Sequence, residues 1–480
     1  MASSETTVAV VGGGITGLCA AWYLRKALGP DAVTLLEASD VTGGVVRSAE
    51  QAGFVCDWGP NGFLDREPLM LQWLDDLGVR GETIQANAAA ARRFILTSGG
   101  LEEILPPPRF FFSPLLPLKG RLRLLAEPFI PPRRDHAGET IYDFAARRIG
   151  ADAAEWLVRP MVTGVFGGDA RLLMLEHSFP RMAAMEREHG GLFRAMLAKG
   201  RARRRARKRG EPVTAGSPIG PGGTLTSFPG GVGRIAEAAA AALKDAAVWR
   251  KCAAESITGP ETPMSGEGWL GSKRYALRLA DGGTLRADGV VVAAPAHAAA
   301  PVVQDWRPAL SKALGAIPYA GMTVVCAGYS RDAVGHSMDG FGFLVPPALG
   351  KRVLGCIWTS SLFPAHAPKG SVFLRAMVGG YTDPAALFLT DDDLLDLIRR
   401  EIHPLLRING EPEFFRVFRH AHAIPQYIEG HGARLRTIEE SEEACPGLAF
   451  AGNAYRGVGM NDCVVSARRA VDRLMAHAGG

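Results

Sequence analysis

The sequence lacks the features that mark secreted, disulfide-rich and membrane-spanning proteins. Its seven cysteines are scattered through 480 residues, odd in number and never arranged as C-x-x-C, which argues against a disulfide framework or zinc knuckle and indicates a reducing compartment. No apolar run reaches the roughly 20 residues needed to span a bilayer. The best candidate, 290–303, is interrupted by Pro295, His297 and Pro301. No basic segment precedes the first apolar run, so we expect no signal peptide.

The net charge and the length of the chain further limit which classes of protein this sequence can belong to. The net charge of +5 is small and unevenly spread, which argues against nucleic acid as a partner. The chain is too long for one simple core, so we expect two or three domains. We therefore expect a cytoplasmic bacterial protein that is either soluble or peripheral on the inner face of the cell membrane.

The N-terminal stretch has the spacing of a dinucleotide-binding unit. A buried strand, Val8–Val11, leads into a G-x-G-x-x-G turn at Gly12, Gly14 and Gly17. An apolar helix, Ile15–Leu28, and a second strand, Val33–Leu36, follow, and the second strand ends at the acid Glu37. Gly14 has no side chain to block a pyrophosphate, and the helix N-terminus offers it free N–H groups. Glu37 can accept hydrogen bonds from ribose hydroxyls and repels a 2′-phosphate, so NADP is disfavoured. Gly43-Gly44 is a second point where the backbone can approach the ligand.

The C-terminal end predicts a second ligand-binding turn. Residues 448–474 are typical of a strand, a glycine-rich loop and a helix that begins near Asn461. Gly452, Gly457 and Gly459 allow the backbone to approach a ligand. The positive end of the helix would stabilise the negative N1–C2 region of a reduced flavin, whereas a nicotinamide has no such need. A nucleotide site at each end of the chain therefore favours FAD over NAD.

Between these ends the sequence predicts a first sheet, a basic and aromatic segment, helices and a second β region. The buried strand at 288–292 is expected to complete the sheet begun at Val8, and 296–440 is expected to be a mixed second region. Arg92 and Arg93 stand at the start of an apolar strand, where an arginine could bind a carboxylate. Helices are predicted over 139–165, 181–200 and 391–402, and 225–243 is predicted as a turn followed by a helix.

Two basic stretches are open to more than one interpretation. In 106–134, arginines and Lys119 alternate with Phe110–Phe112, Leu115, Leu116, Phe129 and Ile130. This pattern suits a membrane headgroup interface, or equally a core helix with a basic outer face. The run 201–209 holds seven Lys and Arg, and we expect a mobile, solvated loop that continues into the Gly/Pro-rich segment after it. Attraction to anionic lipid is the alternative for this run, ahead of nucleic acid.

Together these motifs resemble the oxygen-dependent, FAD-dependent protoporphyrinogen oxidases, within the amine-oxidase-like flavoprotein superfamily. The resemblance runs almost end to end. The motifs that carry it are G12-G-G-I-T-G17, Glu37, Gly43-Gly44, G59-P-N-G62, R93-F, G164-V-F-G-G-D169, G340-F-G-F-L-V-P346, S361-L-F-P, I424-P-Q-Y427 with Gly430-His431, and G452-N-A-Y-R-G-V-G-M-N-D-C463.

The resemblance implies a mixed α/β fold in three parts. These are a Rossmann-like FAD-binding domain (1–70, 222–295 and 441–480), a mixed-sheet substrate domain (71–91 and 296–440) and a helical, membrane-associating domain (92–210). It also implies a set of FAD contacts: Gly12, Gly13, Gly14, Ile15, Thr16, Gly17, Glu37, Ala38, Gly43, Gly44, Val45, Gly59, Pro60, Asn61, Gly62, Ala254, Gly452, Asn453, Val458, Gly459 and Met460.

The resemblance further implies the substrate contacts and the reaction. Arg93 would pair with a propionate, Phe341, Leu344 and Met377 would form an apolar wall around the tetrapyrrole, and Gly168 would face the pyrrole nitrogens. Protoporphyrinogen IX would lose a hydride from a meso carbon to flavin N5 and become protoporphyrin IX, with O₂ reduced to H₂O₂. No catalytic side chain and no metal are implied. A homodimer and hand-over of the product to a ferrochelatase are implied partners.

Two departures and several alternatives remain at this point. The first departure is that Val41 stands where the superfamily usually has Arg and Val45 where it often has an aromatic or basic residue, a gap that Arg47 would compensate. The second is that the Arg-rich run 201–209 is longer and more basic than the family pattern. Coproporphyrinogen III is an alternative substrate, and an amine oxidase, a carotenoid-type desaturase or a non-catalytic FAD-binding scaffold are more remote alternatives. His420, His422 and His431 could form a metal site, but no Cys or carboxylate pattern supports one.

Overall fold

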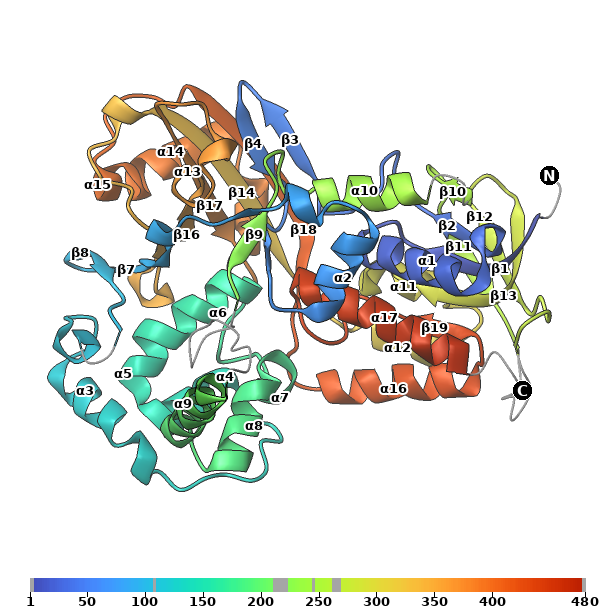
Figure 1. Cartoon of the computed structure of the whole chain (residues 1–480), viewed down its shortest axis with the longest axis horizontal. Coiled ribbons are helices and arrows are strands. Elements are labelled where there is room, and N and C mark those ends of the chain that lie inside the picture. The colour runs from blue at the N-terminus through green and yellow to red at the C-terminus, as the bar shows by residue number, and fades with distance from the viewer. Residues whose placement is uncertain (1–3, 107–108, 210–222, 244–246, 261–268, 477–480) are drawn as a thin grey trace.

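The computed structural model describes residues 4–106, 109–209, 223–243, 247–260 and 269–476. It shows a mixed α/β molecule with two seven-stranded sheets and a separate group of helices (Figure 1). The predicted helix Ile15–Leu28 and the predicted strand Val33–Leu36 are confirmed residue for residue. None of the helices in the described part of the chain is both long and apolar enough to cross a membrane.

The first sheet is assembled from distant parts of the chain. Its order is β10-β2-β1-β13-β12-β11, with β19 paired to β13. The strands are β1 (Ser4–Val11), β2 (Val33–Leu36), β10 (Ala247–Trp249), β11 (Ala254–Thr258), β12 (Tyr275–Leu279), β13 (Thr284–Val292) and β19 (Leu448–Phe450). β1 pairs in parallel with both β2 and β13, which confirms that the strand at 288–292 completes the sheet begun at Val8. Residues 8–11 of β1 and 287–292 of β13 are buried, and this explains their continuous apolar runs.

Helices cover both faces of the first sheet. One core contains α1 (Ile15–Leu28), α2 (Pro68–Asp76), α10 (Arg234–Ala242) and α17 (Met460–Ala476). The other core contains α11 (Ala296–Val302), α12 (Pro308–Gly315) and α16 (His431–Ala444). Four of these segments, 71–76, 296–302, 308–315 and 431–440, pack on the first sheet, although the sequence-based division placed them in the substrate domain.

The second sheet is mainly antiparallel, in the order β18-β14-β17-β16-β15-β7-β8. Its strands are β7 (Phe94–Thr97), β8 (Gly100–Glu103), β14 (Tyr319–Ser330), β15 (Gly342–Leu344), β16 (Val353–Trp358), β17 (Ser371–Gly379) and β18 (Phe414–Pro425). β7 and β8 come from the part of the sequence that was assigned to the helical domain. One face packs on α14 (Asp391–Glu401), and the other meets the hairpin of β3 (Ser48–Gln51) and β4 (Phe54–Asp57).

The helical part contains shorter helices than the sequence predicted. The helix expected over 139–165 is divided into α4 (Ile141–Ile149), α5 (Ala151–Ala153), a π-helical turn (Ala154–Val158) and α6 (Arg159–Phe166), and α7 (Leu175–Ser178) follows. Gly150 ends α4 with a φ of +96°. The helix expected over 181–200 is two helices, α8 (Pro180–His189) and α9 (Leu192–Lys208), because Gly190 turns the chain with a φ of +74°.

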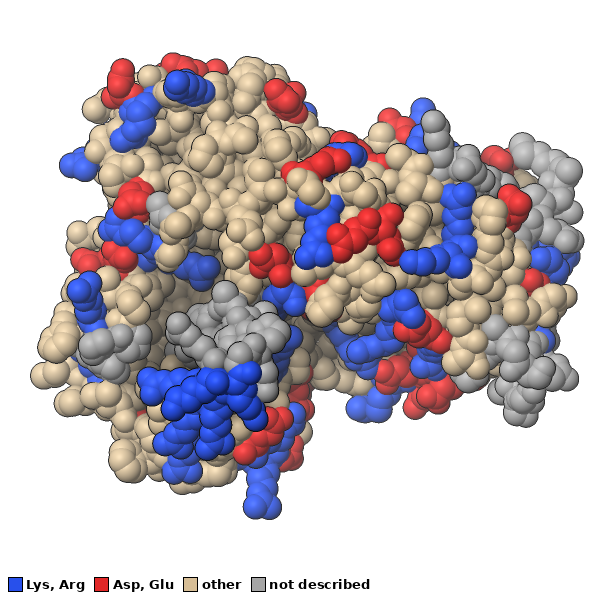
Figure 2. Space-filling view, in the orientation of Figure 1, with Lys and Arg blue, Asp and Glu red and all other residues tan. Residues whose placement is uncertain are grey.

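The expected loop at 201–209 is also wrong, because α9 continues through it to Lys208. Arg, Lys and Ala all favour helix, and no Gly or Pro interrupts the run before Gly210. The result is a concentration of positive charge on the surface over α9 (Figure 2). The Gly/Pro-rich residues 210–222, part of the same prediction, lie outside the described residues.

A buried ion-pair network holds the helical part together. Arg147 donates to both Glu139 and Glu186, while Arg148 donates to Glu127 and Glu186. His136 adds a 2.7 Å contact from Nδ1 to Glu139. All three carboxylates are at most 3% exposed, so the arginines are required to compensate their charge.

Candidate functional site

The predicted phosphate turn has the shape of a ligand cradle. A Cβ atom placed on Gly17 would lie 1.8 Å from the Gly12 carbonyl oxygen, so only glycine allows α1 and β1 to pack this closely. A Cβ on Gly14, in contrast, would meet nothing within 4 Å. Gly14 is the N-cap of α1, and no side chain caps the helix there. The free N–H groups of the first turn therefore face open space, which suits a pyrophosphate.

Glu37 is fixed at the end of β2 by hydrogen bonds to both carboxylate oxygens. Its Oε2 accepts from Gly13 N–H at 2.8 Å, and its Oε1 accepts from the N–H and hydroxyl of Ser39 at 2.8 and 2.7 Å. The segment that leads to Ala254 lies alongside, because Cys252 N–H donates to the Glu37 carbonyl at 2.9 Å. The carboxylate remains partly exposed, so it stays accessible for the ribose contact that the sequence predicts.

Two further turns lie against the phosphate turn. Gly43 N–H donates to the Gly13 carbonyl at 2.7 Å. A Cβ on Gly59 would lie 2.7 Å from the Val45 carbonyl oxygen, which places the 59–62 turn beside Val45. Val41 and Val45 are both more than 40% exposed, while Arg47 lies over the Trp58 ring with Cζ 3.9 Å from its centroid. Arg47 therefore brings positive charge to this turn.

The C-terminal loop closes the same region from the other end of the chain. Thr16 of α1 hydrogen-bonds to the thiol of Cys463 in α17. Burial raises the pKa of that thiol to about 11, although the hydrogen bond from Thr16 lowers it. Asn461 Nδ2 donates to the Leu64 carbonyl at 2.8 Å, which ties α17 to the 59–62 turn. Asp462 accepts from Gly459 N–H at 3.0 Å, so a carboxylate offsets part of the positive end of α17.

These turns fit a dinucleotide cofactor. Gly452 has a φ of +137° and open space where a Cβ would be, and Tyr427 donates from its hydroxyl to the Asn453 carbonyl. Val458 packs beside Tyr427, and Met460 lies in the same core as Ile15. Open space at Gly14 and Gly452, a fixed acid at Glu37 and two apposed helix N-termini are the requirements of a bound flavin dinucleotide.

The residues predicted to form the substrate wall lie on the second sheet. Met377 is directly opposite Gly355, which in turn is opposite Leu344. Directly opposite residues share one face, so Met377 and Leu344 flank a position without a side chain. Leu344 also contacts α6, because a Cβ on Gly164 would lie 2.6 Å from its Cδ2. This row gives a flat apolar surface.

Arg93 and Phe341 stand at the end of this wall. Phe341 N–H donates to the Arg92 carbonyl at 2.8 Å, and the Arg93 guanidinium carbon is 5.2 Å from the Phe341 ring centroid. Arg93 is exposed to solvent, yet the protein surrounds it closely enough for desolvation to lower its pKa. The guanidinium is therefore accessible to solvent, although the surrounding protein removes part of its hydration. Arg92 differs because it pairs with Glu103 and Asp339.

Gly168 is buried at the end of α6. A Cβ there would lie 2.0 Å from Gln426 Oε1, so no larger residue fits without moving Gln426. The preceding Gly167 accepts from Tyr381 N–H at 2.7 Å and lies beside the Met322 side chain. The Gly167–Gly168 turn is therefore held against the end of the second sheet that carries Met377.

The sequence analysis missed Arg375. This arginine lies two residues before Met377 on β17, is 5% exposed and donates to the Gly59 carbonyl. His420 makes a similar link, with Nε2 2.9 Å from the Trp58 carbonyl oxygen. A charged residue within the apolar strand S-V-F-L-R-A-M-V-G was the available signal. Strand alternation would have placed it on the same face as Met377.

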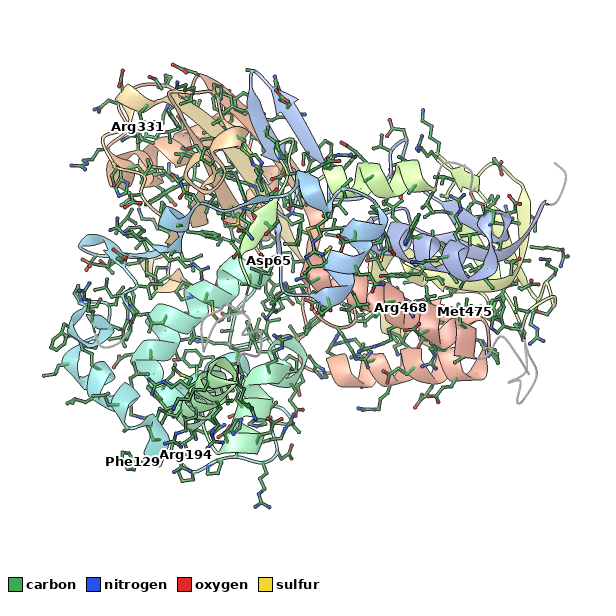
Figure 3. All side chains as sticks on the ribbon, viewed as in Figure 1. Asp65, Phe129, Arg194, Arg331, Arg468 and Met475 are labelled. Carbon is green, nitrogen blue, oxygen red and sulfur yellow. The ribbon has the colours of Figure 1, made fainter. Side chains whose placement is uncertain are left out.

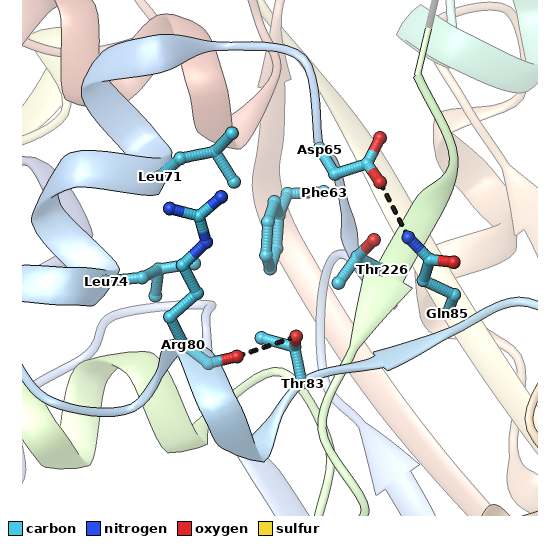
Figure 4. Close-up of a pocket in the computed structure, with 8 residues that line it drawn as sticks. All are labelled: Phe63, Asp65, Leu71, Leu74, Arg80, Thr83, Gln85 and Thr226. Atoms are coloured by element: carbon cyan, nitrogen blue, oxygen red, sulfur yellow. Dashed lines mark hydrogen bonds between the residues drawn. The ribbon is translucent and has the colours of Figure 1, made fainter. Parts of the chain in front are cut away.

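A separate pocket is lined by Phe63, Asp65, Leu71, Leu74, Arg80, Thr83, Gln85 and Thr226 (Figure 4). Its polar groups are already paired: Gln85 donates to Asp65 at 2.9 Å, and Arg80 donates to Asp75 at 2.6 Å. None of the predicted site residues lines it, so we assign no ligand to it.

The three histidines considered as metal ligands have other contacts. His420 bonds to Trp58, His422 stacks on His297 with ring centroids 4.0 Å apart, and His431 Nε2 is 3.1 Å from the Tyr455 carbonyl oxygen. Within the described residues, the group with metal-like spacing is instead His136, Glu139 and Glu186. Arginines already occupy both of those carboxylates.

Comparison with known proteins places the chain in a flavoprotein context. Residues 15–475 match the flavin-containing amine oxidoreductase family. The chain is 30% identical to a coproporphyrinogen III oxidase of Propionibacterium freudenreichii, with 98% of this chain and 91% of the relative covered. A coproporphyrinogen III oxidase of Bacillus subtilis is 29% identical, with 99% of each covered. The mitochondrial protoporphyrinogen oxidase of Nicotiana tabacum is 27% identical, with 99% and 96% covered.

Solved structures share the fold. A protein of Exiguobacterium sp. 255-15 superposes with a TM-score of 0.79 at 23% identity and 99% coverage of both chains. Cyclohexylamine oxidase from Brevibacterium oxydans gives a TM-score of 0.64 at 18% identity, with 98% of this chain and 99% of that chain covered.

Proposed function

The chain belongs to the flavin-containing amine oxidoreductase family, and from this premise we propose that it oxidises a porphyrinogen to a porphyrin. The protein is an oxidoreductase and its cofactor is FAD. The observation that carries the proposal is the row Met377–Gly355–Leu344 with Arg93 at its end. A flat apolar wall beside one free guanidinium suits a planar macrocycle that carries carboxylates. The names of the relatives in two porphyrinogen oxidase groups support the same chemistry.

The side chains in the proposed mechanism bind and orient the substrate. Bound FAD would accept a hydride from a meso carbon, and reoxidation by O₂ would give H₂O₂. Arg93 would hold a propionate, and Leu344 and Met377 would fix the ring plane and exclude water. The turns at Gly12–Gly17, Gly43–Val45 and Gly59–Gly62, the acid Glu37 and the loop at 452–460 would hold the cofactor. No side chain is required as nucleophile.

Two substrates fit this proposal. Protoporphyrinogen IX, giving protoporphyrin IX, is the main candidate because its ring and few carboxylates suit the apolar wall and the guanidinium of Arg93. Coproporphyrinogen III is the second candidate, favoured by the names of the bacterial relatives. The purified protein should be given each substrate in air, with porphyrin fluorescence and H₂O₂ recorded. The larger kcat/KM identifies the substrate, and no turnover of either refutes the proposal.

Arg93→Ala tests the carboxylate contact. Loss of one charge-assisted hydrogen bond should raise KM roughly 10- to 100-fold with a smaller effect on kcat. Arg92→Ala is the matched control, because this neighbouring arginine pairs with Glu103 and Asp339 at the surface. Equal KM values for the two variants would show that Arg93 does not bind the substrate carboxylate.

We also propose that the helical part attaches to anionic membrane surfaces. Five large apolar side chains are exposed on 112–129: Phe112, Leu118, Leu122, Leu125 and Phe129. Leu118, Leu122 and Leu125 lie on one face of α3 (Leu118–Leu125). Figure 3 shows Phe129 near Arg194, whose guanidinium donates to the Pro128 carbonyl at 3.0 Å. Phe110, Leu115 and Leu116 are buried in a core, which agrees with the alternative interpretation of a core segment for these three residues.

Liposome co-sedimentation tests this attachment. The double variant with Phe112→Ser and Leu122→Ser should bind anionic vesicles less than the wild type does, because it buries less apolar surface in the lipid. Phe388→Ser is the control, because Phe388 is 86% exposed but lies on the second-sheet domain. Unchanged binding of the double variant refutes the attachment. A cytoplasmic location, a homodimer, hand-over to a ferrochelatase and the three-domain division remain parts of the proposal.

A further inference from the structure

Arg375 is a buried cation in the mainly apolar layer between the second sheet and the β3–β4 hairpin. Phe373 and Met377, two residues before and after it on β17, share its face of the sheet. That face packs on the β3–β4 hairpin through Phe54, Cys56, Met322, Val324 and Phe373. The neighbouring β14 residue directly opposite Arg375 is Cys326. Packing in this layer does not require a charged side chain, because an apolar residue of similar size would fill the same space.

The charge of Arg375 has little compensation from the described residues. Its Nη2 donates to the Gly59 carbonyl oxygen, while its Nε–H is buried without an acceptor. None of the ion pairs formed by described residues includes it. Asp57 is close enough to feel its charge, but Asp57 already accepts from Ser48 Oγ at 2.6 Å and Val232 N–H at 2.9 Å. Burial raises the pKa of the Asp57 carboxyl, the charge of Arg375 lowers it, and no ion pair between described residues joins the two groups.

A buried guanidinium without a counter-ion is strongly unfavourable, so an anionic oxygen is expected beside it. Its bond to Gly59 places Arg375 at the turn that is proposed to contact FAD. We propose that Arg375 fixes the Gly59–Gly62 turn against the second sheet and stabilises the negative charge of reduced FAD. The inference rests on the proposed cofactor contact at this turn. It makes Arg375 a positioning residue that raises the reduction potential of the bound cofactor.

A substrate carboxylate is the other anion that the same guanidinium could hold. The two candidate anions, reduced FAD and a substrate carboxylate, differ in when they are present in the site. Reduced FAD needs the cation in the absence of any substrate, whereas a carboxylate would change only KM. Measuring the potential of the holoenzyme without substrate therefore separates them.

The experiment compares Arg375→Gln, Arg375→Lys and Arg416→Gln in the holoenzyme. Glutamine can still donate to Gly59 but has no charge, and lysine keeps the charge. Arg416 is the matched control, because it lies opposite the same Cys326 on β18 but contacts Gln51 at the rim. The midpoint potential of bound FAD should be measured against redox dyes, and the FAD content from absorbance.

We expect Arg375→Gln to weaken binding of reduced relative to oxidised FAD about tenfold, which lowers the potential by about 30 mV for a two-electron couple. Arg375→Lys and Arg416→Gln should keep the wild-type potential. An unchanged potential in Arg375→Gln overturns the inference, and an accompanying rise in KM would assign Arg375 to a substrate carboxylate. If the glutamine variant does not fold, a lowered potential in Arg375→Lys overturns it. Failure of the wild type to oxidise a porphyrinogen would leave these potentials unaffected, so the two proposals fail separately.

Discussion

Substitution of the second and third glycines of the G-x-G-x-x-G motif, Gly14 and Gly17, should separate cofactor binding from folding. Gly17→Ala would place a Cβ 1.8 Å from the Gly12 carbonyl oxygen, so β1 or α1 has to move by more than 1 Å. Overpacking of this kind costs about 1–3 kcal/mol, and the backbone contact here puts it near the upper end. We therefore expect the free energy of unfolding of the apoprotein to fall by about 3 kcal/mol.

Gly14→Ala is the matched change with the opposite consequence. A Cβ at Gly14 meets no protein atom within 4 Å, and its φ of −69° suits alanine. The apoprotein should therefore keep its stability to within about 0.5 kcal/mol. The methyl group would occupy the space proposed for the pyrophosphate and displace it from the helix N-terminus. Loss of one charge-assisted hydrogen bond should weaken FAD binding roughly 10- to 100-fold.

Urea unfolding of the apoproteins and fluorescence titration with FAD measure the two effects. The expected result is a crossed pattern, in which one variant loses stability and the other loses affinity. If Gly14→Ala bound FAD as tightly as the wild type, the pyrophosphate would not approach this turn. If Gly17→Ala were as stable as the wild type, the close packing of α1 on β1 would be refuted.

Two more changes test the buried charges. Glu127→Gln removes one of the two buried carboxylates that pair with Arg148, so the helical part should lose up to about 3–5 kcal/mol of stability in urea, and an unchanged midpoint would refute the network. Desolvation lowers the pKa of His431 from 6.5 to about 4, so its neutral form stabilises the fold above pH 6.5. That contribution, about 3 kcal/mol, should be lost as the pH falls from 6.5 to 4, and His431→Asn should flatten the profile. If the stability of the variant fell as steeply with pH as that of the wild type, titratable groups other than His431 would be responsible for the loss of stability.

The first sheet was predictable because its signals are local. A buried strand, a glycine turn, a helix and an acid follow one another within Val8–Glu37, and each residue type has one physical role there. The substrate wall was predicted from the family resemblance. Its geometry was not, because Met377 and Leu344 meet only through strand pairing with Gly355, which local sequence does not encode.

The errors have equally physical causes. The helical segments 139–165 and 181–200 were predicted as single helices because their apolar spacing continues past Gly150 and Gly190, whose positive φ values only the structure reveals. The run 201–209 was predicted as a loop from its charge, although its residues favour helix. Arg375 was missed because its importance depends on Gly59, 316 residues earlier in the chain.

The order of strands in the first sheet has a consequence for biosynthesis. β1 and α1 leave the ribosome first, but α17 and β19, which complete their core and bring the glycine loop at 452–460, leave it last. At about 5–20 residues per second, the phosphate turn waits on the order of 20–90 s for its partner. Once β13 has been made, the edge of β13 that later pairs with β19 stays unpaired until β19 follows. If the loop at 452–460 holds the cofactor as proposed, FAD can bind fully only after this last part of the chain has been made, and a chain that stops short of β19 should bind no FAD.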